Sequence, residues 1–513
     1  MSFSFIAAPS AERAALHHAV GEFGWKNGVI DAGPWSVAVH TGPVARAVQV
    51  STLVADKTLV LIGDVLNRAQ LVSVLCMYDS LALTASDAEL VHLAIRELGA
   101  SALALVEGSF VGLLVNKETN SISAFTDVNG MMPCYVTLLA QPWIASEIKL
   151  LRACSRFVPE FSSAQKLVAP ELRADNYSPV SNVRKVKPGE VLKVGSDGYG
   201  MPLLESSLFH AFRPQRDRVL SQPQALRLID TLMRSSVEQC VSGAGRVGIP
   251  LSGGLDSSLV TALAKQSLSE LSTFSIGTEL SNEFEFAAQV ANHLGTKHKE
   301  FLLSDDDVLT GLVEAVYYNE IYDGLSAEIQ APLLALYRKT EGMVDTLITG
   351  YGSDLLFGGV LPLQEPSRAA NLVLWEQVYR TRCTGEFSNF GAQHYGMQVR
   401  HPFWSNRLIG FCLDLCPSLK VSNDEVKVAL REYAADEDLL PHNIIWRKKI
   451  GIHEGSSINR MFANKLGIDV ERYDLKSRFS YFVYREFLEN GKTPWTTGAA
   501  ELMERFARDI KSA

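Results

Sequence analysis

The stretch Val247-Gly248-Ile249-Pro250-Leu251-Ser252-Gly253-Gly254-Leu255-Asp256-Ser257-Ser258 decides the fold of the second half of the chain. Its apolar first five residues predict a buried strand, and Leu259, Val260 and Leu263 predict a helix after the loop. Glycines let the backbone approach phosphate oxygens, serine hydroxyls donate hydrogen bonds, and a helix N-terminus supplies free N–H groups. We therefore predict a phosphate site formed by Ser252, Gly253, Gly254, Leu255, Asp256, Ser257 and Ser258.

Asp256 lies inside this predicted anion site, where a carboxylate repels phosphate unless a cation lies between them. Mg²⁺ prefers oxygen ligands and bridges phosphates, so we assign Asp256 to a magnesium ion. The sequence has no GxxxxGK[ST] pattern, and the lysine that holds a γ-phosphate in P-loop proteins is therefore missing. Cleavage between the α and β phosphates of ATP fits better. The alternative, a turn whose glycines serve only its geometry, is weakened by the flanking strand and helix.

The Ser-Gly-Gly-x-Asp-Ser pattern resembles the signature of the ATP pyrophosphatase (PP-loop) superfamily, whose members cleave ATP to AMP and pyrophosphate. Segments 275–284, 350–359 and 446–457 resemble one branch of it, the asparagine synthetase and β-lactam synthetase family. This resemblance implies that Ile276 and Gly350 lie beside the nucleotide and that Asp354 is a second Mg²⁺ ligand. It also implies that Lys427 contacts pyrophosphate. For Lys427 the alternative is a solvated helix face, shared with Arg431 four residues later.

The second glycine-rich loop departs from asparagine synthetases at Tyr351, where those enzymes have glutamate. The β-lactam-forming members carry tyrosine there, and the resemblance implies that Tyr351 and Glu386 form a catalytic dyad. A phenol polarised by a carboxylate can accept the proton of a nucleophilic amine. The same resemblance implies that Lys449 stabilises the oxyanion of a tetrahedral intermediate. Surface positions are the alternatives for Glu386 and for the basic segment 447–449.

The first half of the chain has a different pattern. From Val37 to Val194, short β-rich segments such as 58–62 and 110–115 alternate with turns, and helices such as 87–98 are few. The pattern predicts an α+β domain with stacked antiparallel sheets. Segments 63–67, 107–110 and 130–133 resemble the glutamine-hydrolysing Ntn domain of asparagine synthetases. However, Ser2 replaces the cysteine nucleophile and the glutamine-binding Arg-His-Arg-Gly-Pro-Asp segment is absent, so we expect an inactive domain.

The second half alternates apolar strands with amphipathic helices. We expect strands at 247–251, 273–276 and 344–348, and helices at 224–240 and from Phe284 to a stop at Gly295. This alternation is typical of an α/β fold whose parallel sheet is covered on both faces. The predicted organisation is an Ntn-hydrolase-like α+β domain over residues 1–208, followed by an α/β PP-loop synthetase domain over residues 209–513.

Composition restricts the partners and the compartment. The 513 residues include 48 Lys and Arg against 57 Asp and Glu, and the net charge of -9 disfavours binding to nucleic acid. No apolar run is long enough to span a membrane, and the N-terminus lacks the pattern of a secretory signal, so we expect a cytoplasmic protein without membrane partners. Seven cysteines without a CxxC pair predict reduced thiols. The family's tendency to oligomerise points to a homo-oligomer.

The resemblance implies a reaction in two steps, in which ATP adenylates a substrate carboxylate and an amine then displaces AMP. Loss of an ammonia source favours an amine within the substrate, which closes a ring. Segment 319–330 is most similar to the carbapenam-forming branch of the family. This implies that the segment lines the substrate pocket and that an amino dicarboxylate, carboxymethylproline, reacts with ATP and Mg²⁺. The alternatives are an ammonia-dependent asparagine synthetase, a monocyclic clavam-type β-lactam synthetase and a catalytically dead homologue.

Overall fold

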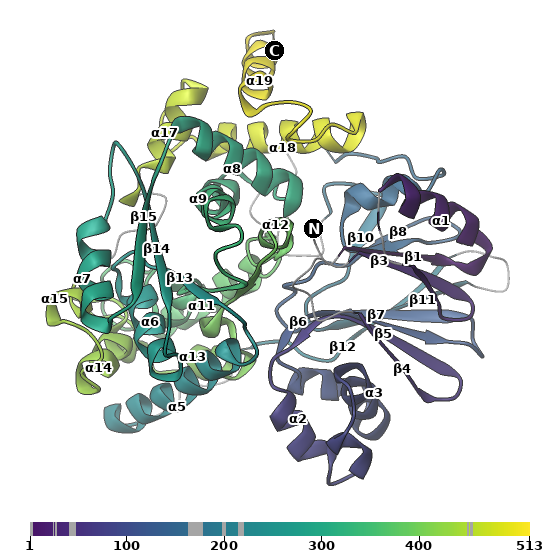
Figure 1. Cartoon of the computed structure of the whole chain (residues 1–513), viewed down its shortest axis with the longest axis horizontal. Helices are drawn as coiled ribbons and strands as arrows, with labels where there is room; N and C mark the ends of the chain where they lie inside the picture. The colour runs from purple at the N-terminus through teal and green to yellow at the C-terminus, as the bar shows by residue number, and fades with distance from the viewer. Residues whose placement is uncertain are drawn as a thin grey trace.

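The computed structural model describes residues 4–23, 25, 28–40, 48–162, 178–196, 202–213, 220–448, 451 and 455–512. The chain forms two lobes that lie side by side, with the N-terminal part in one and the C-terminal part in the other (Figure 1). Strand β12 of the first lobe ends at Leu208 and helix α5 of the second begins at Gln222. No helix among the described residues is long and apolar enough to cross a membrane.

The first lobe is built on two antiparallel sheets of six described strands each, ordered β10-β8-β9-β1-β3-β2 and β12-β11-β7-β6-β5-β4. The strands are β1 (Ser4–Pro9), β2 (Val29–Asp31), β3 (Trp35–His40), β4 (Gln49–Val54), β5 (Lys57–Val65), β6 (Gly108–Asn116), β7 (Ser121–Thr126), β8 (Tyr135–Thr137), β9 (Ile144–Ala145), β10 (Val183–Lys185), β11 (Glu190–Ser196) and β12 (Pro202–Leu208). The predicted antiparallel sheets are thereby confirmed.

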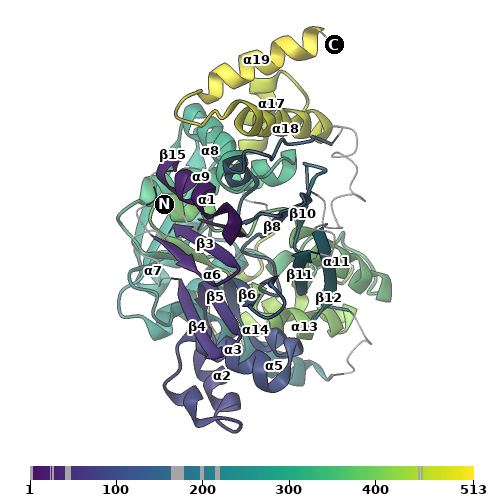
Figure 2. The same ribbon diagram turned by 90° about the vertical axis from the view of Figure 1, so that its right-hand side faces the viewer.

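Alternate residues along these strands meet in an apolar layer between the two sheets, for example Phe5 and Val37 from one sheet and Ile62 and Val111 from the other. Helix α1 (Arg13–Glu22) covers the outer face of one sheet, while α2 (Arg68–Leu75) and α3 (Asp87–Leu98) cover the other (Figure 2). Helix α3 has the predicted bounds because Ser86 and Glu89 form a capping box before it and Gly99 ends it.

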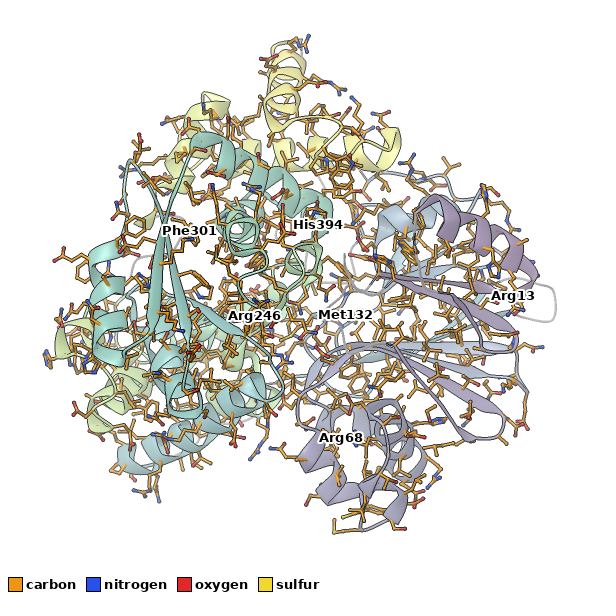
Figure 3. All side chains as sticks on the ribbon, viewed as in Figure 1. Arg13, Arg68, Met132, Arg246, Phe301 and His394 are labelled. Carbon is orange, nitrogen blue, oxygen red and sulfur yellow. The ribbon has the colours of Figure 1, made fainter. Side chains whose placement is uncertain are left out.

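The second lobe contains a parallel sheet of five described strands in the order β15-β14-β13-β16-β17. The strands are β13 (Val247–Pro250), β14 (Ser272–Thr278), β15 (Lys297–Leu303), β16 (Thr346–Ile348) and β17 (Gln398–Arg400). One face is covered by helices α5 (Gln222–Val241), α6 (Leu255–Ser267), α7 (Phe284–Leu294), α13 (Asn406–Asp414) and α14 (Val428–Asp436). The other is covered by α8 (Asp305–Tyr318), α9 (Gly324–Thr340) and α12 (Phe390–His394), which confirms the predicted architecture. Side chains fill the layers of both lobes (Figure 3).

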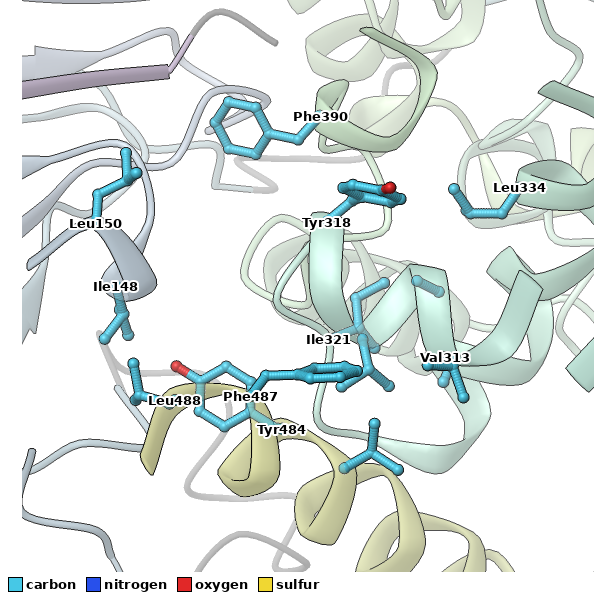
Figure 4. Close-up of a cluster of buried hydrophobic side chains, with 14 of the residues drawn as sticks. Ile148, Leu150, Val313, Tyr318, Ile321, Leu334, Phe390, Tyr484, Phe487 and Leu488 are labelled. Carbon is cyan, nitrogen blue, oxygen red and sulfur yellow. The ribbon is translucent and has the colours of Figure 1, made fainter. Parts of the chain in front are cut away.

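An apolar cluster joins the two lobes. Ile148 and Leu150, from the 3-10 helix Ile148–Ala153 of the first lobe, belong to the same buried cluster as Ile321 of the second (Figure 4). Helix α18 (Tyr473–Asn490) contributes Tyr484 and Phe487 to this cluster, and α17 (Ile458–Leu466) and α19 (Ala499–Ser512) pack beside it. This buried apolar cluster favours a fixed placement of one lobe against the other.

Candidate active site

The two glycine-rich loops predicted from the sequence lie at one edge of the parallel sheet. The strand order reverses at β13, with β14 and β15 on one side and β16 and β17 on the other. In such sheets ligands bind outside the carboxyl ends of the strands at the point of reversal. The loops after β13 and β16 meet there: a Cβ on Gly350 would lie 2.6 Å from the backbone nitrogen of Ser257. Glycine therefore permits the backbones to touch.

The first loop, residues 252–258, is shaped by its own serines. The Ser252 backbone N–H donates to the Ser257 hydroxyl over 3.2 Å, and the Gly254 N–H donates to the Ser252 hydroxyl over 3.2 Å. Gly253 has a φ of 70°, and a Cβ there would lie 2.5 Å from the backbone of Phe286. The side chain of Leu255 is buried in the core, and Ser258 is fully buried with its N–H donating to the Gly254 carbonyl over 3.2 Å.

A single buried lysine joins the carboxylates that follow the two strands. Lys427 Nζ lies 2.5 Å from Asp256 Oδ2 and 2.6 Å from Asp354 Oδ1, and 3.2 Å from the Ser353 hydroxyl. Burial acts to lower the pKa of Lys427, but the charges of Asp256 and Asp354 outweigh it and raise the pKa above its usual value. A Cβ on Gly359 would lie 2.0 Å from Asp354 Oδ1, so glycine is required beside this cluster.

The sequence-based placement of Lys427 within a helix is wrong. Lys427 has a left-handed backbone with a φ of 60°, and α14 begins after it, at Val428. Its side chain is 1% exposed, so the alternative of a solvated helix face is also wrong. Arg431 does not share its role: it is buried and donates to the backbone carbonyls of Val426 over 3.0 Å and Arg447 over 3.1 Å.

The two carboxylates fit a magnesium ion by their chemistry. Asp256 Oδ1 is buried and accepts no hydrogen bond from the described residues, which leaves an oxygen for a cation. Mg²⁺ takes one or two protein carboxylates and completes its shell with phosphates and water. Two carboxylates are therefore enough, and the described residues contain no larger cluster of His, Cys, Asp and Glu that could hold a metal. The assignment of Asp256 and Asp354 to Mg²⁺ stays a prediction.

The predicted dyad residues are in contact. The Tyr351 hydroxyl, from the loop after β16, donates to Glu386 Oε2, from the loop before α12. The Tyr351 loop is held by Thr349, whose hydroxyl accepts from the Tyr351 N–H over 3.3 Å and lies 2.7 Å from His401 Nδ1. Burial lowers the pKa of His401 to about 3, so this histidine is neutral at ordinary pH. Tyr351 and Glu386 therefore form a hydrogen-bonded pair in a fixed place.

Glu386 has a second hydrogen-bond partner, Ser326, which the sequence did not reveal. The Ser326 hydroxyl donates to Glu386 Oε1 over 2.8 Å, and Glu386 is 8% exposed. Gly385 has a φ of 83°, and a Cβ there would lie 2.9 Å from the Asn319 carbonyl oxygen. Ser326 lies in segment 319–330, which the sequence singled out for its resemblance to the family. No local pattern, however, indicated which of its residues would reach Glu386.

Residues at and after the end of β14 contact the chain before and after Lys449. Arg447 forms an ion pair with Glu283, and Thr278 donates its hydroxyl to the Ser456 carbonyl over 2.7 Å. Ile276 lies on the same strand and is half-buried. Lys449 falls outside the described residues, so its predicted oxyanion role stays a prediction. Ser2 falls outside them as well.

A cavity of about 40 Å³ lies between the two lobes, away from the phosphate loop. It is lined by residues that include Asp64, Glu107, Asn129, Arg400, His401 and Trp404. Glu107 crosses the junction and accepts hydrogen bonds from the Asn406 N–H over 3.0 Å and from the Arg407 N–H over 3.4 Å, at the start of α13. Glu107, which lines the cavity from the first lobe, thus caps the N-terminus of α13 in the second lobe.

The parallel sheet, with a serine-glycine loop, two carboxylates and a buried lysine at its switch point, has the architecture of α/β domains that bind ligands at the carboxyl ends of their strands. Two protein-family models match the sequence and identify the family more specifically. One described as asparagine synthase matches residues 228–390 and 377–493. A second, described as the N-terminal part of carbapenam-3-carboxylate synthase, matches residues 39–206.

Individual relatives agree with these matches. A carboxyethyl-arginine β-lactam synthase from Streptomyces clavuligerus is 30% identical over 430 residues, which cover 83% of this chain and 80% of that protein. A glutamine-hydrolysing asparagine synthetase from Sandersonia aurantiaca is 26% identical over 396 residues, which cover 72% and 69%. The chain therefore belongs to the asparagine synthase family, which also contains β-lactam synthases. It is an ATP-dependent, amide-forming synthetase.

Proposed function

We propose that the protein is a carbapenam synthetase, which closes carboxymethylproline to carbapenam-3-carboxylate and converts ATP to AMP and pyrophosphate. The observation that carries the proposal is the hydrogen bond from Tyr351 to Glu386 beside the two glycine-rich loops. A phenol backed by a carboxylate is suited to accept a proton from an amine. The match of residues 39–206 to carbapenam-3-carboxylate synthase supports the choice of product.

In the activation step, a carboxylate oxygen of the substrate attacks the α-phosphorus of ATP, and the bond from that phosphorus to pyrophosphate breaks. Loop 252–258 holds the phosphate oxygens with its N–H and hydroxyl groups, and Ile276 and Gly350 lie beside the nucleotide. Lys427 adds positive charge next to Asp256 and Asp354. Bound Mg²⁺, held by the two aspartates, supplies further positive charge at the phosphates.

In the cyclisation step, the substrate's own amine attacks the activated carbonyl carbon, and the bond from that carbon to AMP breaks. The amine proton passes to the Tyr351 oxygen while the Tyr351 proton passes to Glu386. Closing a strained ring requires the amine and the carbonyl to be held in a reactive pose and kept from water. Lys449 is assigned to the developing oxyanion, as the resemblance implies.

The first lobe supplies no ammonia in this scheme. We assign residues 1–208 to an Ntn glutaminase-like domain that is inactive, because position 2 is serine. The amine must then come with the substrate, which agrees with tyrosine at position 351. We further propose a cytoplasmic protein that forms a homo-oligomer and binds small molecules, without nucleic-acid or membrane partners.

The test compares three substrates with Mg-ATP and the purified full chain. With carboxymethylproline we expect one AMP and one pyrophosphate per product, and a product lighter than the substrate by one water. Aspartate with ammonia, and carboxyethyl-arginine, should give no product. AMP formation with aspartate and ammonia would instead favour an asparagine synthetase. Turnover of carboxyethyl-arginine would favour a monocyclic β-lactam synthetase, in line with the Streptomyces clavuligerus relative.

A further inference from the structure

Ser326 links the Tyr351–Glu386 pair to a second carboxyl group, that of Asp323. Its hydroxyl lies 2.8 Å from Glu386 Oε1 and 2.6 Å from Asp323 Oδ2. Asp323 is the N-cap of α9, and its other oxygen accepts from the Leu325 N–H over 3.1 Å. Tyr351, Glu386, Ser326 and Asp323 thus form one continuous row of polar contacts.

These polar contacts lie in the protein interior. Ser326 is 2% exposed, and Asp323 and Glu386 are each 8% exposed, so water competes little for these groups. A serine hydroxyl has a single hydrogen, yet two carboxyl oxygens lie within its reach. The hydroxyl can donate to only one of these oxygens at a time, and its hydrogen bond to Glu386 Oε1 would help to orient Glu386 Oε2 toward Tyr351.

The segment that carries Ser326 is fastened against the Glu386 loop at further points. The Gly391 N–H donates to Asn319 Oδ1 over 2.9 Å, and Gly385 leaves no room for a side chain beside the Asn319 carbonyl. The start of α9 is also fixed from behind, because the Gly324 N–H donates to the Ser477 hydroxyl over 3.0 Å. These contacts fix the position of Ser326 relative to Glu386.

The first lobe holds the same segment through Glu320. This buried glutamate has a φ of 51° and accepts from the Ile148 N–H and the Lys149 N–H, each over 2.9 Å. Lys185, also from the first lobe, donates to the Cys383 carbonyl over 3.1 Å, in the loop that carries Glu386. Both segments that position the dyad are thus anchored to the first lobe, in which Ser2 replaces the cysteine nucleophile of the family.

We propose that Ser326, with Asp323 behind it, is a positioning residue that orients Glu386 toward Tyr351 for the cyclisation step. The inference rests on the proposed function and adds to it a residue that would act through Glu386. Activation of the carboxylate uses other groups, at the ends of β13 and β16. Loss of the Ser326 hydroxyl should therefore slow ring closure and leave adenylation intact.

The experiment uses the full chain with Mg-ATP and carboxymethylproline, and measures two rates for each variant. One is the substrate-dependent exchange of label between pyrophosphate and ATP, which reports adenylation; the other is formation of the cyclised product. For Ser326→Ala we expect exchange within about twofold of wild type and cyclisation slower by about 10- to 100-fold. Ser326→Thr keeps the hydroxyl and should restore most of the rate.

The matched control is Ser480→Ala. Ser480 is also a fully buried helical serine, but its hydroxyl donates only within α18, to the Lys476 carbonyl over 3.1 Å. Both rates should stay within about twofold of wild type, since an isolated buried hydroxyl contributes only about 1 kcal/mol to folding. This control separates loss of a hydroxyl from loss of this particular one.

A pH profile adds a readout that general damage would not produce. Among the described residues, Tyr351 donates to Glu386 and Ser326 lies between Glu386 and Asp323, while His401 behind Tyr351 is neutral. A hydroxyl that donates to a carboxylate favours its ionised form. The acidic limb of the cyclisation profile should therefore move to higher pH in Ser326→Ala and return in Ser326→Thr.

The outcomes separate the two proposals. If wild type neither exchanges label nor forms product with carboxymethylproline, the proposed function fails and takes this inference with it. If wild type cyclises and Ser326→Ala matches it in both rates, the function stands and the positioning role is refuted. Equal loss of both rates in Ser326→Ala, without rescue by threonine, would also refute it, because the defect would then be structural.

Discussion

In the second lobe a buried lysine joins two carboxylates at the carboxyl edge of the parallel sheet, whereas in the first lobe two buried charged side chains contact backbone groups across the junction. In the second lobe Lys427 joins Asp256 and Asp354, the two carboxylates nearest the phosphate loop. In the first lobe Glu107 caps helix α13 of its neighbour, and Lys185 donates to the backbone of the Glu386 loop.

This difference shows that the first lobe contributes to the second through contacts at the junction. The first lobe has a serine at the position of the expected nucleophile, yet its buried charges still meet partners across the junction. Glu320 of the second lobe makes the reverse contact to that of Glu107, because it accepts hydrogen bonds from two N–H groups of the first lobe. In the proposed function, the first lobe serves as a support and the second lobe carries out the reaction.

The largest effect should follow from removing a carboxylate at the sheet edge. Asp256→Ala should slow pyrophosphate exchange on the order of 10³-fold, because the substitution removes the charge assigned to the metal. The matched control is Asp345→Ala, at the opposite end of β16, where the carboxylate pairs with Arg246 over 2.8 Å. Exchange should stay within about twofold there. Full exchange in Asp256→Ala would contradict the assignment of this edge to activation.

Removing the lysine between the carboxylates should affect folding as well as activity. Lys427→Met leaves two adjacent carboxylates without their cation, and breaking a buried pair costs about 3 kcal/mol or more in the free energy of unfolding. Mg²⁺ should raise the melting temperature more in this variant than in wild type, because the ion supplies the missing charge. Thermal unfolding with and without Mg²⁺ checks both. An equal response to Mg²⁺ would argue against a metal between Asp256 and Asp354.

At the junction the expected effect is on stability alone. Glu107→Ala leaves N–H groups at the start of α13 without their acceptor and should lower the free energy of unfolding by about 2 kcal/mol. Glu118→Ala, at an exposed turn of the same lobe, should change it by less than about 0.5 kcal/mol. Denaturant titration measures both. Equal effects of the two variants would mean that Glu107 adds nothing across the junction.

The smallest effect concerns pH and the interior of the first lobe. Burial raises the pKa of Asp127 to about 6, although the N–H groups of Asn129, Met131 and Met132 act against it. The folded state therefore favours the protonated acid, and stability is lost as pH rises through about 6. Between pH 5 and pH 7 the free energy of unfolding should fall by about 1 kcal/mol from this group.

Asp127→Asn provides the comparison for this pH dependence. The amide does not titrate, so its stability curve should lack the decrease between pH 5 and pH 7, whatever its absolute value. Denaturant titrations at several pH values give the slope for each protein. A wild-type slope equal to that of the variant would show that Asp127 titrates normally.

The fold followed from local patterns in the sequence. Strand β13 and helix α6 were predicted by their apolar residues, and α3 by its helical pattern, since each signal lies within the element itself. The phosphate loop was recognisable for the same reason, because its serines and glycines bind one another within residues 252–258.

The rest of the site depended on contacts between distant segments. Tyr351 and Glu386 are 35 positions apart, and only the family resemblance suggested that they meet. Lys427 was misplaced because a left-handed residue before a helix leaves no periodic signal. Ser326 could not be found from sequence, since its task depends on a loop 60 positions later.

The central claim is that activation and ring closure use different groups of one site, and Tyr351→Phe tests it most directly. This variant keeps the ring but loses the hydroxyl that donates to Glu386. With Mg-ATP and carboxymethylproline, pyrophosphate exchange should stay within about twofold of wild type while ring closure slows by about 10²- to 10⁴-fold. Unchanged ring closure, or loss of exchange in step with it, would contradict the account.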